Sequence, residues 1–179
     1  MKPLRNAALK PALLAFPLLL VACGDGRSLT NRIGLADPLR EPARAAPFEY
    51  GRPGWLTGRP AEAAQAAAEI EAFAEAAETD PLWTHPRNAV LLPQLQIARR
   101  EFRQALGVPA NTPNAVAIRS FAAAAEALRR CDTRSAEAVL APVGGGATLA
   151  RLGNLPRLPR VEEAAQAVAI EVNTPNLNN

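Results

Sequence analysis

The stretch Pro60–Thr79, PAEAAQAAAEIEAFAEAAET, indicates the fold class of this chain. Alanine is its most frequent residue and has the highest intrinsic helix propensity. Pro60 suits the first turn of a helix, and Glu62 follows where the helix dipole favours an acid. The stretch therefore predicts a long helix that ends at Asp80-Pro81. Its apolar residues recur at helical spacing and predict one narrow buried face, with the glutamates making the rest acidic. That face consists of Ala63, Ala66, Ile70, Phe73 and Ala77, and the acidic residues are Glu69, Glu71, Glu75 and Glu78.

A second helix is predicted over residues 88–106, bent or restarted at Pro93. Gly107 follows it at a position that favours a left-handed C-terminal cap. This helix is basic, whereas the first is acidic, so the two are expected to pair as an antiparallel hairpin. Exposed ion pairs contribute only about 0–1 kcal/mol each, so charge would select the partner more than stabilise it. The apolar face is Leu95, Ala98, Phe102 and Ala105, and the basic residues are Arg99, Arg100 and Arg103.

The remaining sequence predicts further helices and no sheet. Thr112-Pro113 is a helix start signal, and a third helix should run to about Arg130. Asp132 or Thr133 should cap a short fourth helix that ends near Leu140. A single turn over residues 147–152 and a last helix over 160–172 follow. No segment alternates with period two. We therefore predict an all-α, Ala-rich bundle of four to five helices over residues 59–173, followed by a disordered tail, 174–179.

The N-terminus is typical of an export signal. Lys2, Arg5 and Lys10 precede an apolar run over residues 11–22, which is too short to span a bilayer. The run ends in Leu20-Val21-Ala22-Cys23, which resembles the lipobox of bacterial lipoproteins. The resemblance implies removal of residues 1–22 by cleavage between Ala22 and Cys23. It also implies a diacylglycerol on the Cys23 thiol and an N-acyl chain on the new amine, with no other cofactor.

The lipobox resemblance also implies a location. The mature protein would be lipid-anchored in the cell envelope and would face the periplasm. Gly24 follows the cysteine where an aspartate would favour the inner membrane, so the outer membrane is the expected site. Residues 23–58 are interpreted as the lipidated cysteine and a flexible tether, because prolines and glycines interrupt any apolar period. The aromatic residues between Phe48 and Leu56 raise the alternative that this part packs back on the domain.

Charge and cysteine content exclude some functions. The chain has 20 Lys+Arg against 17 Asp+Glu, and the three basic residues of the leader account for the excess. The mature chain is therefore neutral and lacks the basic footprint of a nucleic-acid partner. Only 2 cysteines occur, so lipidation of Cys23 leaves Cys131 without an internal disulfide partner. Cys131 is expected to be a buried small apolar residue, with intermolecular pairing as the alternative.

The sequence offers few candidates for chemistry. His85 is the only histidine and lies near Asp80, so it could be a general base or a metal ligand. The favoured interpretation is a loop residue packed near Trp83, because no second histidine completes a usual site. The triple glycine over residues 144–146 lacks the lysine and Ser/Thr of a phosphate loop. The Cys and His counts exclude a zinc cluster, and we predict that the protein is not an enzyme.

Two functions follow as hypotheses. The favoured one is an envelope lipoprotein whose helical domain binds a protein partner and serves as a structural or assembly accessory. The alternative is a small-ligand-binding or hydrolytic lipoprotein. Its pocket would lie near Trp83 and His85, with Arg99 and Arg103 of the second helix as further contacts.

Overall fold

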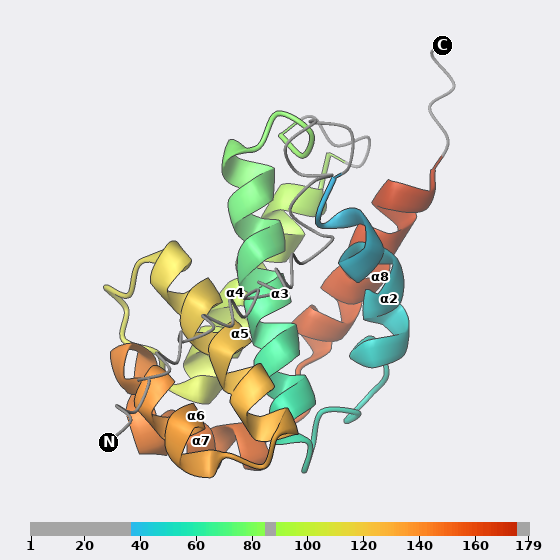
Figure 1. Ribbon diagram of the computed structural model, residues 1–179. Helices are drawn as coiled ribbons and strands as arrows, with labels where there is room; N and C mark the ends of the chain where they lie inside the picture. Colours follow the sequence, from blue (N-terminus) through green and yellow to red (C-terminus); the bar gives the residue numbers. More distant parts are fainter. Residues whose placement is uncertain (1–36, 85–88, 175–179) are drawn as a thin grey trace, which may run out of the picture. The chain divides into compact units, whose positions relative to one another are not determined.

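The computed structural model describes residues 37–84 and 89–174 (Figure 1). All regular structure in these two ranges is helical, which confirms the predicted all-α class. The helices are α2 (Arg40–Glu49), α3 (Pro60–Thr79), α4 (Leu91–Leu106), α5 (Asn114–Arg129), α6 (Thr133–Val139), the 3₁₀ turn η1 (Ala141–Val143), α7 (Gly145–Gly153) and α8 (Pro159–Asn173). Within the same ranges, no helix is both long enough and apolar enough to cross a membrane. The predicted lipobox with Ala22 and Cys23, His85, and the predicted tail beyond Thr174 lie outside the described residues.

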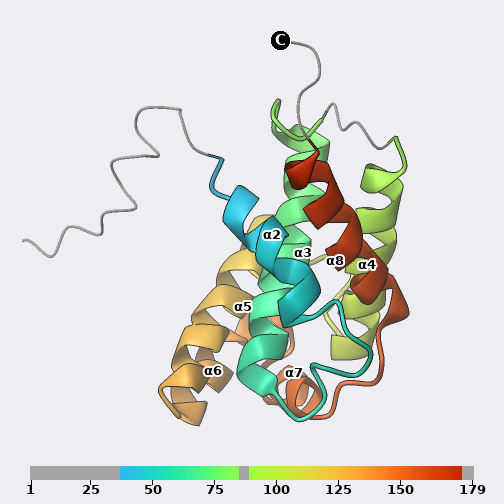
Figure 2. The same cartoon turned by 90° about the vertical axis from the view of Figure 1, so that its right-hand side faces the viewer.

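Helix α3 is the central element of the bundle. It packs most extensively against α5 and also contacts α4, α7, α2 and α8, so neighbours surround it (Figure 2). The narrow apolar face predicted for it is therefore wrong, because most of its circumference is buried. The glutamates Glu69 and Glu71, which were predicted to be solvated, lie in the interior.

Small side chains allow the helices to approach α3 closely. Helices α3 and α5 are rich in fully buried alanines, such as Ala64 and Ala74 on α3 and Ala117 and Ala124 on α5. Because alanine buries little area, the larger side chains must supply most of the apolar burial. Those that are almost completely buried include Ile70, Phe73, Leu91, Leu95, Leu106, Phe121, Leu140 and Leu152.

Helix α2 corrects the predicted tether. Residues 40–49 form a helix that belongs to the same compact unit as the bundle, so this unit begins before residue 59. Ala43 and Ala46 are buried where α2 packs against α8. The alternative that the aromatic stretch packs back is confirmed for Tyr50 and Leu56, which join the core, whereas Phe48 is exposed. The described residues hold seven α-helices, more than the four to five predicted.

The predicted antiparallel hairpin of α3 and α4 is confirmed. Arg103 pairs with Glu71, and the earlier residue Arg99 pairs with the later residue Glu78, so the helices run in opposite directions. Gly107 closes α4 in the left-handed conformation with φ 68°, as predicted.

Three local predictions had different outcomes. Asp132 caps α6, because its side chain accepts a hydrogen bond from the Ser135 backbone N–H at 3.0 Å. Helix α5 begins at Asn114, one residue later than the start signal suggested, and no side chain caps it.

Cys131 is exposed, so its predicted burial is wrong. It occupies a tight connection between α5 and α6 with φ 59°, which turns the chain away from the core.

Candidate functional site

Arg103 ties three helices together. Its Nε and Nη2 atoms donate to the two carboxylate oxygens of Glu71 on α3, at 2.5 and 2.7 Å. Nη2 also donates to Asn114 Oδ1 on α5 at 2.9 Å, and Nη1 donates to the carbonyl of Thr112 at 3.1 Å. Asn114 in turn donates to Glu75 at 2.5 Å. The guanidinium is therefore held on both edges, and its orientation is fixed.

Glu71 depends on this pair because it has little access to water. Glu71 is 2% exposed, and a buried carboxylate is strongly unfavourable unless it is paired and hydrogen-bonded. The hydrogen bonds to Glu71, together with its charge and those of Glu75 and Glu78, raise the pKa of Arg103 against the effect of partial burial. Arg103 is therefore held in one orientation, and the carboxylate of Glu71 already neutralises its charge.

Arg99 makes a similar pair one turn earlier on α4. Its Nη2 donates to Glu78 Oε1 at 2.6 Å, and Gln96 donates to the same oxygen at 3.0 Å. Partial burial acts to raise the pKa of Glu78, but the hydrogen bonds from Arg99 and Gln96 outweigh it and lower the pKa below its usual value. Arg99, like Arg103, thus joins α4 to α3.

A groove open to solvent runs beside these pairs. It has a volume of about 460 Å³ and lies along α4 and the connection to α5. We call it the α4 groove. Its lining residues are Arg99, Arg100, Arg103, Gln104, Gly107, Val108, Ala110 and Asn114. Arg100 is exposed, and it forms no ion pair within residues 37–84 and 89–174. Because Arg99 and Arg103 are already paired, Arg100 supplies the free positive charge of the α4 groove.

Trp83 lies apart from this groove. Its ring stacks on Phe73 at a centroid distance of 5.6 Å, and its Nε1–H donates to Asp37 Oδ2 at 3.1 Å. At 3% exposure it is a core residue that fixes the turn after α3. It borders a small cavity of about 90 Å³ whose lining residues are Asp37, Arg40, Leu82, Glu171 and Val172. The structure therefore brings Arg99 and Arg103 together but does not place Trp83 with them, and His85 is outside the described residues.

A second cluster, which the sequence did not predict, lies in the loop between α2 and α3. The guanidinium carbons of Arg52 and Arg59 lie 4.5 and 3.9 Å from the centre of the Trp55 ring. A cation over an aromatic face is attracted by the negative charge density of the ring. We call Arg52, Trp55 and Arg59 the Trp55 cluster. The signal in the sequence was a tryptophan with an arginine on each side within a few residues, in a segment interpreted as a tether.

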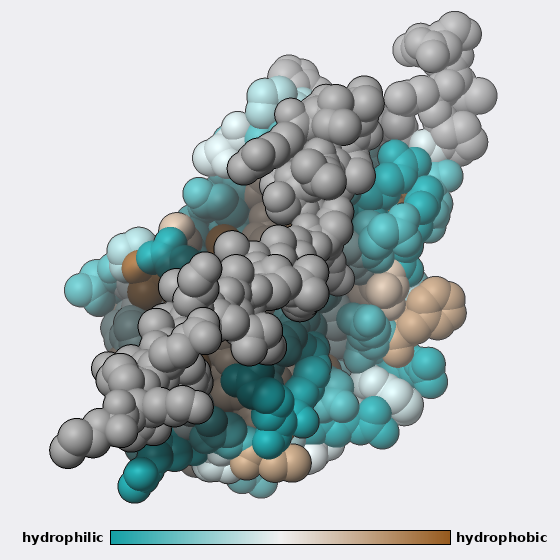
Figure 3. Space-filling model, in the orientation of Figure 1, coloured by the Kyte–Doolittle hydropathy of each residue, from teal (hydrophilic) through white to brown (hydrophobic). Residues whose placement is uncertain are grey.

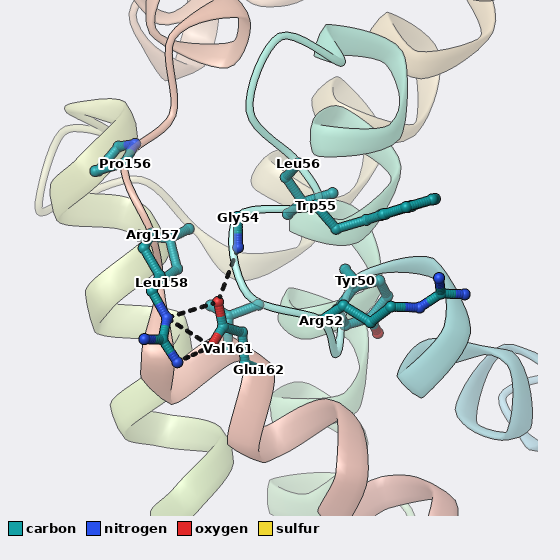
Figure 4. Close-up of a pocket in the computed structure, with 10 residues that line it drawn as sticks. All are labelled: Tyr50, Arg52, Gly54, Trp55, Leu56, Pro156, Arg157, Leu158, Val161 and Glu162. Atoms are coloured by element: carbon teal, nitrogen blue, oxygen red, sulfur yellow. Dashed lines mark hydrogen bonds and ion pairs between the residues drawn. The ribbon is translucent and has the colours of Figure 1, made fainter.

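A crevice on the inner side of this loop is nearly filled (Figure 4). Its volume of about 10 Å³ is too small for a ligand and comparable to the space that one water needs. Glu162 closes it by accepting hydrogen bonds from the Gly54 N–H at 3.3 Å and from Arg157 at 2.9 Å. Figure 4 shows Arg52 and Trp55 directed away from Glu162. The hydrogen bonds of Glu162 hold the loop in place, while Arg52 and Trp55 border the crevice with their side chains turned away from Glu162.

The exposed apolar side chains do not form one large patch on the face shown in Figure 3. Its described part is mainly hydrophilic, with hydrophobic residues in separate spots. Single exposed apolar residues are normal for protein surfaces. Those in the described residues include Phe48, Leu82, Val90, Ile97 and Ile170. No group of three or more metal-ligating side chains occurs in the part of the chain that the structure describes.

Comparisons with protein-family models, with curated proteins and with solved structures gave no match to this chain. The geometry of the α4 groove and of the Trp55 cluster is therefore the basis for the functional argument.

Proposed function

We propose that the protein is a lipid-anchored envelope lipoprotein whose helical domain binds an acidic segment of another protein in the α4 groove. It would act as a structural or assembly accessory and not as an enzyme. The observation that carries this proposal is the free guanidinium of Arg100 beside two arginines whose positions are fixed by Glu78 and Glu71. The lipobox resemblance at Cys23 supports the anchor.

The chemistry of the α4 groove favours a protein over a reacting substrate. Arginine is enriched in protein interfaces, where its planar head forms two-point hydrogen bonds with carboxylates. Val108 and Ala110 add a small apolar surface next to the arginines. A partner helix or loop with one or two acidic residues beside an apolar one would match both features. Arg99 and Arg103 would lose little conformational freedom on binding, because their guanidinium groups are already fixed by Glu78 and Glu71.

The anchor is tested by replacing Cys23 with alanine in the full-length chain. The unchanged chain should incorporate a fatty-acid label and fractionate with membranes. Cys23→Ala should lose the label and should keep residues 1–22, because cleavage depends on the lipidated cysteine. Equal labelling of both chains, or no labelling of either, would contradict the lipoprotein proposal.

The α4 groove is tested by crosslinking in cells, with Arg100→Glu as the variant. Reversal of this charge should remove the crosslinked partner without lowering the melting temperature, because Arg100 is exposed and unpaired. Arg134→Glu is the matched control, since Arg134 is also exposed but lies on α6. Loss of the partner in both variants, or in neither, would argue against a specific role for the α4 groove.

The volume of the α4 groove favours a second candidate, a small acidic ligand. Ligand sites commonly have volumes of about 300–1,000 Å³, and the α4 groove falls within that range. The alternative from the sequence placed such a pocket near Trp83, whereas the arginines line a different cavity. A thermal-shift screen of dicarboxylates and phosphate esters separates the candidates. A shift that Arg100→Ala abolishes would favour the small ligand over the protein partner.

A further inference from the structure

The Trp55 cluster combines an aromatic ring with two arginines, residue types that are common at binding surfaces, and in the described chain no carboxylate pairs with these arginines. Arg52 and Arg59 are exposed, and neither forms an ion pair with a carboxylate in residues 37–84 or 89–174. Within these residues, their guanidinium groups contact the Trp55 ring. The ring attracts both guanidiniums but leaves their outer N–H groups free to bind an anion.

The loop that carries the cluster is rigidly attached to the bundle. The Thr57 hydroxyl donates to the Leu155 carbonyl at 3.0 Å, the Gly54 N–H donates to Glu162, and Leu56 is buried in the core. Gly54 and Gly58 have φ 68° and 74°, a conformation that glycine adopts without steric cost. The cluster is therefore presented in one arrangement, and binding would require little ordering.

An exposed aromatic residue precedes the cluster on the same segment. Phe48, in the last turn of α2, is 69% exposed, although the next aromatic residue, Tyr50, is buried. Tryptophan is enriched at the headgroup level of membranes, because its ring is apolar and its N–H is polar. Arginine binds phosphate with two parallel hydrogen bonds. Trp55 and the two arginines together match an anionic phospholipid headgroup region, and Phe48 is a second exposed aromatic residue of the same segment.

The position of this segment in the chain adds an independent argument. Asp37, the first described residue, is only fourteen positions after Cys23. A chain spans at most about 3.3–3.6 Å per residue, so this segment could separate the domain from lipids on Cys23 by no more than about 50 Å. A short connection of this kind keeps a surface at high effective concentration near the bilayer.

We propose that the Trp55 cluster docks the helical domain on an anionic phospholipid surface. This inference rests on the proposed lipid anchor for its location but not for its chemistry. The domain would lie against the bilayer through the α2–α3 loop. The α4 groove, which shares no lining residue with this surface, would stay available to a partner.

The first experiment uses the two tryptophans of the chain. Trp83→Phe leaves Trp55 as the only tryptophan, and the full-length lipoprotein carrying this change is reconstituted into vesicles with brominated acyl chains. Vesicles of phosphatidylethanolamine and phosphatidylglycerol should quench Trp55 emission and shift it to shorter wavelength. Arg52→Gln/Arg59→Gln should remove the quenching, whereas the control Arg130→Gln/Arg134→Gln should keep it. An anchored protein whose Trp55 is not quenched would overturn this inference and leave the proposed anchor intact.

The second experiment removes the anchor. The mature chain, residues 23–179 with Cys23→Ser, carries neither the leader nor the thioether-linked lipid, and it is tested for flotation with the same anionic vesicles and with neutral phosphatidylcholine vesicles. Loss of two interfacial arginines is expected to weaken binding to the anionic vesicles about 30-fold. Equal flotation of the Arg52→Gln/Arg59→Gln chain and its parent, or equal binding to neutral vesicles, would overturn the proposal. Failure of the anchor itself would be seen separately, as loss of membrane fractionation by the unchanged Cys23 chain.

Discussion

Arg103 donates two hydrogen bonds, at 2.5 and 2.7 Å, to the carboxylate of Glu71, which lies in the middle of the central helix α3. A glutamate there would be destabilising without this partner, since burial of an unpaired charge costs several kcal/mol. The same guanidinium also bonds to the start of α5. One side chain therefore sets the relative positions of three helices and shapes one wall of the α4 groove.

Arg103→Met should lower the free energy of unfolding by about 3–5 kcal/mol, because it leaves the Glu71 carboxylate buried and unpaired. Urea denaturation followed by helical circular dichroism measures the loss. Glu71→Leu/Arg103→Met removes both charges and should recover most of the stability. If Arg103→Met lowers the free energy of unfolding no more than Arg100→Met does, Glu71 must reach water in another way.

Glu69 should make stability depend on pH near neutrality. Burial raises its pKa from 4.5 to about 7, against opposing hydrogen bonds, and one of its oxygens has no hydrogen-bond partner. The folded state therefore holds a proton that the unfolded state releases near its ordinary pKa. The stabilising effect is complete below about pH 4.5 and is lost as pH rises through about 7, a change of at most about 3 kcal/mol.

Glu69→Gln tests that expectation, because glutamine keeps the shape without the titrating group. The variant and the parent should have similar melting temperatures at pH 5, and the variant should be more stable at pH 8. Parallel stability curves across this range would mean that Glu69 is charged in the folded protein.

The contact between α3 and α5 should not accept a larger side chain. Ala124 on α5 is fully buried, and Ala123 beside it is exposed. Ala124→Leu should cost about 1–3 kcal/mol or more, because the helices would have to separate. Ala123→Leu should change stability by less than about 0.5 kcal/mol. Similar effects of both variants in thermal unfolding would contradict close packing at this contact.

Cys131 should be reactive in the folded protein and replaceable by glycine. It is exposed and has φ 59°, a conformation that side chains with a Cβ adopt at a cost. Cys131→Gly should therefore be more stable than Cys131→Ala by about 1 kcal/mol, as measured by urea unfolding. A thiol reagent should label native Cys131 as fast as it labels the unfolded chain. Slow labelling would indicate that the thiol is covered.

The sequence predicted the α3–α4 hairpin well, because acidic and basic side chains at helical spacing on neighbouring helices carry that information locally. It did not predict α2. Pro42 and Pro47 give this stretch the composition of a linker, and the helix depends on burial of Ala43 and Ala46 against α8, far along the chain. Helical content that arises from tertiary contacts leaves little trace in local propensity.

The candidate site was only partly predictable for the same reason. Arg99 and Arg103 were found because they form a basic stripe on one helix. The burial of Glu71 was not predicted, because α4, α5 and α7, which pack against α3, all follow later in the chain. Trp83 was expected near these arginines on sequence proximity alone, but the turn after α3 directs its ring onto Phe73.

The pairing of α2 with α8 imposes an order on synthesis. Arg40 donates to the carbonyl of Val172, and Arg44 donates to Asn173, so the first and last described helices hold each other across 132 and 129 residues of chain. At about 5–20 residues per second, a nascent α2 waits roughly 6–26 s before its partner leaves the ribosome. During that interval, the side of α2 that packs against α8 in the folded protein is exposed to solvent, and the bundle is incomplete. The last helix made therefore completes the bundle.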